Sequence, residues 1–157
     1  MNYYFSRDKL RVQKSNPPPH KATEDEGGEK KMIRALEAVI LSSENAAKLA
    51  EFYREKVGLG QSQEMKIGDK GEKGYDFNLK GANLYILDHS EIKGKNSQPS
   101  RAMFNLEVDD IEKEAERIKK AGVKVVQDIY HVESYGLIAT FEDIDGNYFQ
   151  LVQVRAN

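Results

Sequence analysis

The side chains that could do chemistry are few and scattered. The chain contains no cysteine, which excludes disulfides, thiolate metal sites and cysteine nucleophiles. Its three histidines, His20, His89 and His131, lie far apart in the sequence, a pattern more typical of solvated side chains than of a shared metal site. No Ser-His-Asp arrangement, phosphate-binding GxxxxGKS/T loop or GxGxxG turn is present, so hydrolase and nucleotide-binding functions have no support.

A pair of aspartates near the C-terminus has a spacing found in cation sites. Asp143-Ile144-Asp145-Gly146 is similar to the start of a calcium loop, but the third acidic position is missing and Val154 stands where the terminal glutamate would be. We therefore exclude calcium. The aspartates are predicted to form a turn by accepting hydrogen bonds from their own backbone.

Charge and composition limit the partners. The 157 residues include 24 Lys and Arg against 26 Asp and Glu, a formal net charge of -2, so no overall basic field would attract nucleic acid or anionic lipid. No stretch approaches about 18 consecutive apolar residues, and the N-terminal residues lack the apolar segment of a secretory signal. We expect a cytoplasmic protein with no nucleic acid and no membrane among its partners.

Residues 1–31 are predicted to be a disordered or weakly ordered tail. They contain Pro17-Pro18-Pro19, Gly27-Gly28 and many charged residues, with little apolar material after Val12. Such a segment cannot bury enough apolar surface to offset the entropy of ordering it. Met32 opens the regular pattern and is a second candidate for the start of the chain. A docking arm with aromatic and basic contacts is the alternative function for the tail.

Hydrophobic periodicity predicts a first group of elements after this tail. A strand over 33–41 precedes Ser42-Ser43-Glu44, where a serine is expected to cap a helix that Gly58 ends. The apolar face of that helix carries Leu49, Phe52, Tyr53 and Val57. Three strands are predicted next, at 61–67, 75–80 and 82–87.

The same order of elements repeats after a polar linker, residues 89–100. A strand at 102–108 precedes an acidic cap, Asp109-Asp110, and a helix that ends at Gly122. Three strands are predicted at 124–127, 137–142 and 148–154. Gly58 and Gly122 lie about 65 residues apart, which indicates an internal duplication. We expect a domain over 32–157, with modules 32–88 and 101–157 whose sheets enclose a cavity.

Three segments resemble the vicinal oxygen chelate superfamily, which includes glyoxalase I, extradiol dioxygenases, and fosfomycin and bleomycin resistance proteins. The run from Asn45 to Leu59 is similar to the family's FYxxxLG helix, 104–110 to its FxVDD junction, and 141–147 to its DPDGN hairpin. The resemblance covers about residues 33–154. It implies an α+β fold in which duplicated βαβββ modules form a glyoxalase/bleomycin-resistance-like open barrel.

Family members that do metal chemistry hold the ion with His and Glu side chains on strands that line the cavity. The resemblance assigns these ligand positions to Ala38, Met103, Gln150 and Tyr85. None of the four supplies an imidazole or a carboxylate. We therefore expect no metal and no cofactor.

The same resemblance, with the alternation of side chains along strands, predicts a ligand site. Because Met103 would point inward, Asn105 and Glu107 share its face, as Tyr148, Gln150 and Val152 share one face of the last strand. No catalytic residue is predicted. The polar members could equally satisfy one another across a filled barrel. The expected ligand-binding residues are Tyr85, Met103, Asn105, Glu107, Tyr148 and Gln150.

Three functions are consistent with this sequence. The preferred one is a metal-independent small-molecule binding protein that resembles bleomycin-type resistance proteins, which sequester a ligand without altering it; the resemblance implies a homodimer with the ligand in a groove between chains. The second is a lyase, isomerase or dioxygenase with an atypical metal site or with Glu107 as a general base. The third is a regulatory or interaction module with a filled cavity.

Overall fold

The computed structural model describes residues 33–154, and the predicted tail, residues 1–31, lies outside them. The chain divides into two units, Met1–Arg34 and Ala35–Asn157, of which the second carries all the regular structure described below. No helix within residues 33–154 combines the length and the apolar character needed to cross a bilayer.

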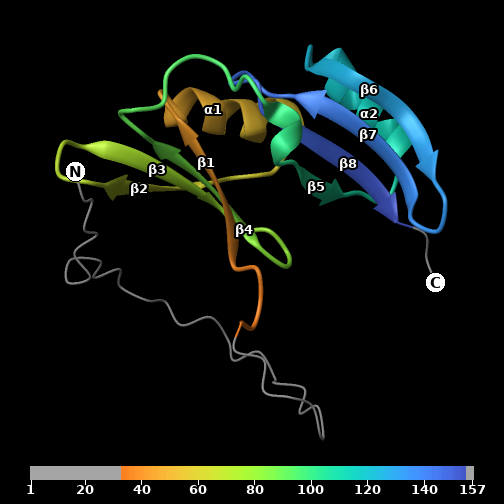
Figure 1. Cartoon of the computed structure of the whole chain (residues 1–157), viewed down its shortest axis with the longest axis horizontal. Coiled ribbons are helices and arrows are strands. Elements are labelled where there is room, and N and C mark those ends of the chain that lie inside the picture. The colour runs from red at the N-terminus through yellow and green to blue at the C-terminus, as the bar shows by residue number, and fades with distance from the viewer. Residues whose placement is uncertain (1–32, 155–157) are drawn as a thin grey trace, which may run out of the picture. The chain divides into compact units, whose positions relative to one another are not determined.

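The first half of the second unit forms a four-stranded mixed sheet, which we call sheet A (Figure 1). Its strands are in the order β1-β4-β3-β2, with β1 parallel to β4 and the other pairs antiparallel. The elements of this half are β1 (Ala38–Ser43), α1 (Ala46–Phe52), the π-helical η1 (Tyr53–Val57), β2 (Gln63–Ile67), β3 (Glu72–Phe77) and β4 (Asn83–Asp88).

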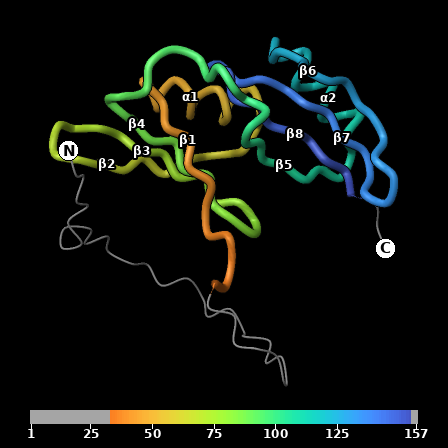
Figure 2. Tube along the Cα trace, in the orientation of Figure 1, coloured from red at the N-terminus to blue at the C-terminus, as the bar shows by residue number. Residues whose placement is uncertain are grey.

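The second half repeats this connectivity in sheet B, whose order is β5-β8-β7-β6 (Figure 2). This repetition confirms the predicted α+β fold built from duplicated βαβββ modules. Within residues 35–154 the two sheets remain separate, so the curved arrangement is open and not a closed barrel. The elements of this half are η2 (Pro99–Arg101), β5 (Phe104–Glu107), α2 (Ile111–Lys120), β6 (Lys124–Val132), β7 (Gly136–Glu142) and β8 (Tyr148–Val154).

A hydrophobic core lies between the helices and one face of each sheet. Leu84 and Ile86 of β4 and Phe149 and Leu151 of β8 belong to it, together with Tyr53 at the end of the first helical segment. Because alternate residues of a strand point to opposite faces, the intervening residues form a second face on each sheet that carries no helix. We call this the open face of sheet A or of sheet B.

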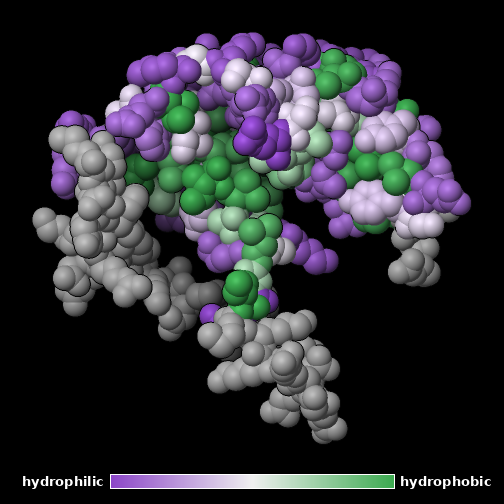
Figure 3. Space-filling view, in the orientation of Figure 1, coloured by the Kyte–Doolittle hydropathy of each residue, from purple (hydrophilic) through white to green (hydrophobic). Residues whose placement is uncertain are grey.

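Several apolar side chains stay exposed outside this core, as the space-filling view in Figure 3 shows. Ile40 on β1 is 59% exposed, Leu36 just before it 68%, and Met103 just before β5 45%. Both β1 and β5 are edge strands. Exposed apolar side chains at strand edges are common at contacts with another molecule.

The helix boundaries show which local predictions were right. Gly58 ends the first helical segment with a left-handed φ of 88°, as predicted, and Asp110 caps α2 by accepting the N–H of Lys113 at 3.0 Å. The prediction of a serine cap for α1 was wrong, because Asn45 is the cap residue and accepts the N–H of Lys48. The hydroxyl of Ser43 instead donates to Asp145 at 2.5 Å.

Several strand boundaries also differ from the prediction. The first strand, expected over 33–41, is β1 at Ala38–Ser43, and its start is therefore five positions later than predicted. β3 begins at Glu72, three positions earlier than expected, because Glu72 and Lys73 pair with the end of β2. β6 continues to Val132 and does not end at residue 127, because two register shifts keep it paired with β7. Such irregularities let a polar, exposed strand follow its neighbour over a longer distance.

The turn between β7 and β8 joins the two halves. One carboxylate oxygen of Asp143 accepts the backbone N–H groups of Asp145 and Asn147, each at 2.9 Å, which confirms the predicted role of this aspartate as a turn former. Its other oxygen accepts the buried Tyr53 hydroxyl at 2.8 Å. Burial raises the pKa of Asp143, and hydrogen bonds from Asn147 and Tyr53 partly offset that rise.

Candidate functional site

The open face of sheet B carries aligned rows of side chains. Strand pairing places Asn105, Gln150, Thr140 and Gln127 in one row, which runs from β5 to β6. A second row contains Glu107, Val152, Ile138 and Tyr130; it is offset by two residues on β5, β8 and β7 and by three on β6, where the register shifts. Neighbouring side chains within a row lie close enough to contact one another.

A cavity of about 510 Å³ opens over the first of these rows. Its floor is a polar pair, Gln150 and Thr140, which are only 9% and 5% exposed. The Gln150 Nε2 donates a hydrogen bond to the Thr140 hydroxyl at 2.8 Å. The full lining is Ser100, Met103, Val126, Gln127, Tyr130, Thr140, Tyr148 and Gln150. Apolar and aromatic walls around a few polar groups are typical of small-molecule sites.

The floor retains hydrogen-bonding capacity. In this amide orientation the carboxamide oxygen of Gln150 accepts no hydrogen bond from any residue in 33–154. Every fully buried side-chain N or O atom in that part of the chain has a partner, so this oxygen is not fully buried, and it belongs to a residue that lines the cavity. The floor therefore offers a neutral acceptor to a molecule in the cavity.

The structure brings half of the expected ligand-binding residues together. Met103, Tyr148 and Gln150 line the cavity. Asn105 lies beside Gln150, but its Nδ2 donates to the Tyr135 hydroxyl at 3.1 Å. Glu107 is exposed in the next row, and Tyr85 belongs to β4 in the other sheet.

Sequence reasoning missed other residues of the cavity, mainly Thr140, Tyr130 and Val126. A signal for Thr140 was present, since it alternates with buried Ala139 and Phe141 along a predicted strand. Tyr130 and its neighbours gave no such signal, because the predicted strand ended at residue 127.

Tyr85 belongs instead to a polar group on the open face of sheet A. The Asn83 Nδ2 donates to both carboxylate oxygens of Asp76, at 3.1 and 3.3 Å, and lies 3.5 Å from the Tyr85 hydroxyl. Burial raises the pKa of Asp76, the hydrogen bond from Asn83 lowers it, and the charge of Glu37 raises it further. The side chains of this group thus hydrogen-bond to one another, and the group lies away from the sheet B cavity.

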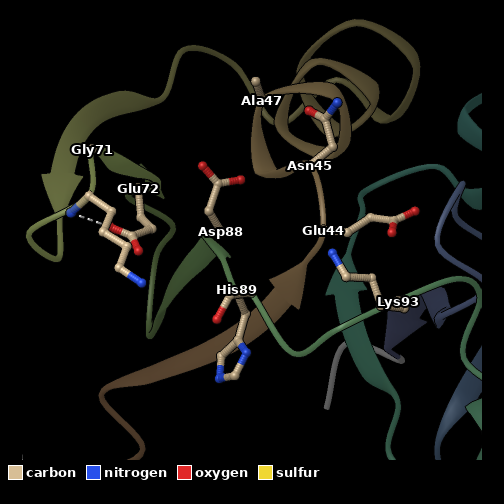
Figure 4. A pocket seen from close by; sticks show the side chains of 10 residues that line it. Glu44, Asn45, Ala47, Gly71, Glu72, Asp88, His89 and Lys93 are labelled. Atoms are coloured by element: carbon tan, nitrogen blue, oxygen red, sulfur yellow. Dashed lines mark hydrogen bonds between the residues drawn. The ribbon is translucent and has the colours of Figure 1, made fainter.

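A second hollow, of about 410 Å³, lies beside the start of α1 (Figure 4). Two of its three carboxylates, those of Asp88 and Glu72, already hold the backbone in place. Asp88 accepts the N–H groups of Ala46 and Lys73 at 2.8 and 2.9 Å, and Glu72 accepts that of Lys70 at 3.0 Å. Since these acids have structural partners, this hollow is the weaker candidate for a binding site.

The residues at the ligand positions implied by the resemblance do not fit a metal ion. Ala38 and Tyr85 lie on sheet A, Gln150 lies on sheet B, and Met103 lies just before β5. None of them offers an imidazole or a carboxylate. Over residues 33–154, no group of three or more His, Asp or Glu side chains is arranged to hold a metal ion. The misfit therefore lies in the chemistry of the side chains at these four positions.

Comparison with solved structures finds many similar folds. The fosfomycin resistance protein FosX from Listeria monocytogenes is 21% identical, with a TM-score of 0.61 over 79% of this chain and 96% of that one. TnmS3, described as an antibiotic binding protein from Streptomyces sp. CB03234, is 22% identical, with a TM-score of 0.58 over 80% and 99%. UcmS2 is 21% identical, with a TM-score of 0.59 over 77% and 98%.

Sequence comparison identifies the family. No curated protein matches the chain. Residues 35–151, however, match the sequence signature of the Glyoxalase/Bleomycin resistance protein/Dioxygenase superfamily. This segment includes all the strands and helices described above except the last three residues of β8. The chain therefore belongs to the glyoxalase/bleomycin resistance protein/dioxygenase superfamily.

Proposed function

We propose that this protein binds a small molecule in the sheet B cavity without a metal ion and holds it without altering it, as a sequestering or resistance protein would. The observation that carries the proposal is the pair Gln150 and Thr140, buried at the floor with a carboxamide oxygen open to the cavity. A ligand that hydrogen-bonds to this oxygen gains a fixed orientation. In the empty cavity, water would hydrogen-bond to the oxygen instead.

The lining defines the chemical class of the ligand. Met103, Val126 and the rings of Tyr130 and Tyr148 form walls suited to apolar or aromatic groups. The floor is neutral, so a charged group placed there would lose hydration without gaining an ion pair. The ligand is thus a small, largely apolar aromatic molecule with a neutral donor such as a hydroxyl or an amide N–H. The antibiotic-binding description of TnmS3 supports this class.

The protein is proposed to bind this ligand as a homodimer. The cavity is open along sheet B, and Met103 at its rim is 45% exposed. Ile40 on the edge strand of sheet A is exposed to 59%. Seating the open face of sheet A from a second copy against sheet B would bury both side chains and cover the ligand.

Ligand-dependent thermal stability tests the binding function. The full-length protein is screened against aromatic antibiotics and small aromatic metabolites, where a ligand raises the melting temperature with the logarithm of its concentration. Gln150→Met should then weaken binding of each hit about tenfold, because one hydrogen bond to the ligand is lost. Gln61→Met makes the same change at an exposed loop position and serves as the matched control.

Two results would contradict the proposal. Binding that is equal in the wild type and in Gln150→Met would place the ligand outside the sheet B cavity. Purified protein that carries a stoichiometric transition metal, with a melting temperature that falls when the metal is removed, would overturn the metal-independent function and favour the enzymatic alternative.

A further inference from the structure

Two apolar residues on the open face of sheet B are unexpectedly buried. Ile138 and Val152 pair with each other in the row next to Gln150 and Thr140. They point away from the helices, yet they are only 7% and 4% exposed. Ile40, on the corresponding open face of sheet A, is 59% exposed. Something other than a helix therefore covers Ile138 and Val152.

Tyr135 is positioned to provide this cover. It lies in the loop that joins β6 to β7, while its hydroxyl accepts a hydrogen bond from Asn105 on β5 at 3.1 Å. In the strand order β5-β8-β7-β6, strand β8 and part of β7 lie between these two points. The Tyr135 side chain must therefore cross the sheet over the row that contains Ile138 and Val152.

The backbone of the loop holds Tyr135 in this direction. Its N–H donates to the carbonyl of Val132 at 3.1 Å. The residues on either side have positive φ, 62° at Ser134 and 145° at Gly136. A side chain at Gly136 would collide with the backbone carbonyl oxygen of Gln153, so the loop is packed directly against β8. Position 136 therefore requires glycine, and Ser134 adopts a left-handed conformation that few side chains tolerate.

We propose that Tyr135 closes one end of the sheet B cavity and so limits the length of the ligand, an inference that rests on the proposed binding function. Gln150, Thr140 and Tyr130 line the cavity, but the cavity does not extend as far as Ile138 or Val152. With Tyr135 removed, these two side chains would become a further stretch of apolar wall. Tyr135 is thus a specificity-determining residue, tethered in place by Asn105.

The first experiment tests the cover without any ligand. In full-length protein with labelled methyl groups, a soluble gadolinium chelate broadens the NMR signals of accessible methyls. Tyr135→Ala should strongly increase the broadening of the Ile138 and Val152 methyls. Tyr135→Phe, which keeps the ring and loses the bond to Asn105, should leave them largely protected. Equal protection in the wild type and in Tyr135→Ala would show that another group covers the row and would overturn the proposal.

The second experiment tests ligand length with a series of 4-alkylphenols, from methyl to octyl, by calorimetry. In the wild type, affinity should stop rising once the alkyl chain reaches Tyr135. In Tyr135→Ala it should continue to rise about fourfold for each further methylene group. Tyr130→Ala, which removes a cavity wall, should instead weaken the short and the long phenols alike.

Different results would contradict the proposed binding site and the proposed role of Tyr135. If the wild type binds short phenols and Tyr135→Ala keeps the same limit of length, the binding site stands and the role of Tyr135 is wrong. If no phenol binds either protein while the methyl groups respond as expected, Tyr135 does cover the two side chains. The proposed binding function would then be wrong, and so would the limit on ligand length that depends on it.

Discussion

Thr140 and Gln150 form the polar floor of the sheet B cavity, and their hydrogen bond leads to a specific prediction. Thr140→Val removes the acceptor of the Gln150 amide at 2.8 Å while the amide stays nearly buried. We expect the free energy of unfolding to fall by about 1–2 kcal/mol. The double variant Thr140→Val with Gln150→Met leaves no unpaired group and should recover part of the loss.

Urea denaturation of the four proteins in this double-mutant cycle measures the coupling between the two side chains. Additive losses would mean that the amide and the hydroxyl do not depend on each other, contrary to the geometry.

Asp143 predicts a component of pH-dependent stability. Because burial raises the pKa of Asp143 above its ordinary value of 3.8, the folded chain keeps this proton to higher pH than the unfolded chain does. Its contribution to stability is therefore fully present below 3.8 and is lost as the pH rises through the raised pKa. Asp143→Asn removes the titrating group.

The measurement is the free energy of unfolding of the wild type and of Asp143→Asn at a series of pH values from about 3 to about 7. The stability of the wild type relative to the variant should decline as the pH rises across this range. A difference that is independent of pH would show that Asp143 titrates alike in the folded and unfolded chains.

Helix α2 stabilises the end of the first helical segment through Arg117. The two terminal nitrogens of this side chain donate to the carbonyls of Lys56 and Val57 at 3.1 and 2.6 Å, and its Nε pairs with Glu114. A cation that bonds the last carbonyls of a helix satisfies groups without an intrahelical partner and opposes the helix dipole. Arg117→Met should therefore lower the free energy of unfolding by about 1–2 kcal/mol.

A control for this prediction lies on the same helix. Lys120 pairs with Glu116 one turn earlier, and both side chains are well exposed. Lys120→Met removes a similar charge and should cost less than about 0.5 kcal/mol. Equal losses in the two variants, measured by thermal and urea unfolding, would mean that Arg117 acts only as a surface charge.

The elements differ in how well the sequence predicts them, for local reasons. The last strand, the helix stop at Gly58, the Asp110 cap and the stop at Gly122, which has a φ of 80° just after α2, are confirmed, because each depends on residues close in sequence. The cap of α1 is not predictable in this way, since Ser42, Ser43 and Asn45 could all serve. Ser43 bonds Asp145, 102 positions further on, which no local pattern reveals.

The candidate site was predictable to a similar extent. Alternation correctly placed Gln150 and Tyr148 on one face, because strand geometry fixes the face of each residue. It could not show that Tyr85, in the sheet of the first module, lies away from the cavity, or that Tyr135 reaches Asn105 over β8 and part of β7. Both facts depend on how the sheets and loops are arranged in space.

The proposed homodimer makes a prediction for the whole chain. Light scattering should give twice the 17.8 kDa of one chain at micromolar concentration. Ile40→Asp places a charge on the exposed edge strand of sheet A and should shift the protein to a monomer, since burying an unpaired carboxylate is costly. Ile92→Asp makes the same change in the linker, where Ile92 is 38% exposed, and should leave the mass unchanged.

Either of two outcomes would contradict this arrangement. A monomeric wild type would contradict the proposed homodimer. A dimeric Ile40→Asp would show that the interface lies elsewhere on the surface.

The turn between β7 and β8 has a consequence for how the duplicated chain unfolds. Tyr53 and Ser43 of the first repeat both bond aspartates of this turn in the second repeat, and Tyr53 also packs against Phe104 and Phe149. If one repeat unfolded alone, a buried phenol or carboxylate of the other repeat would lose its hydrogen-bond partner. A calorimetric scan should therefore show a single cooperative transition, because neither repeat can unfold without removing hydrogen-bond partners from the other.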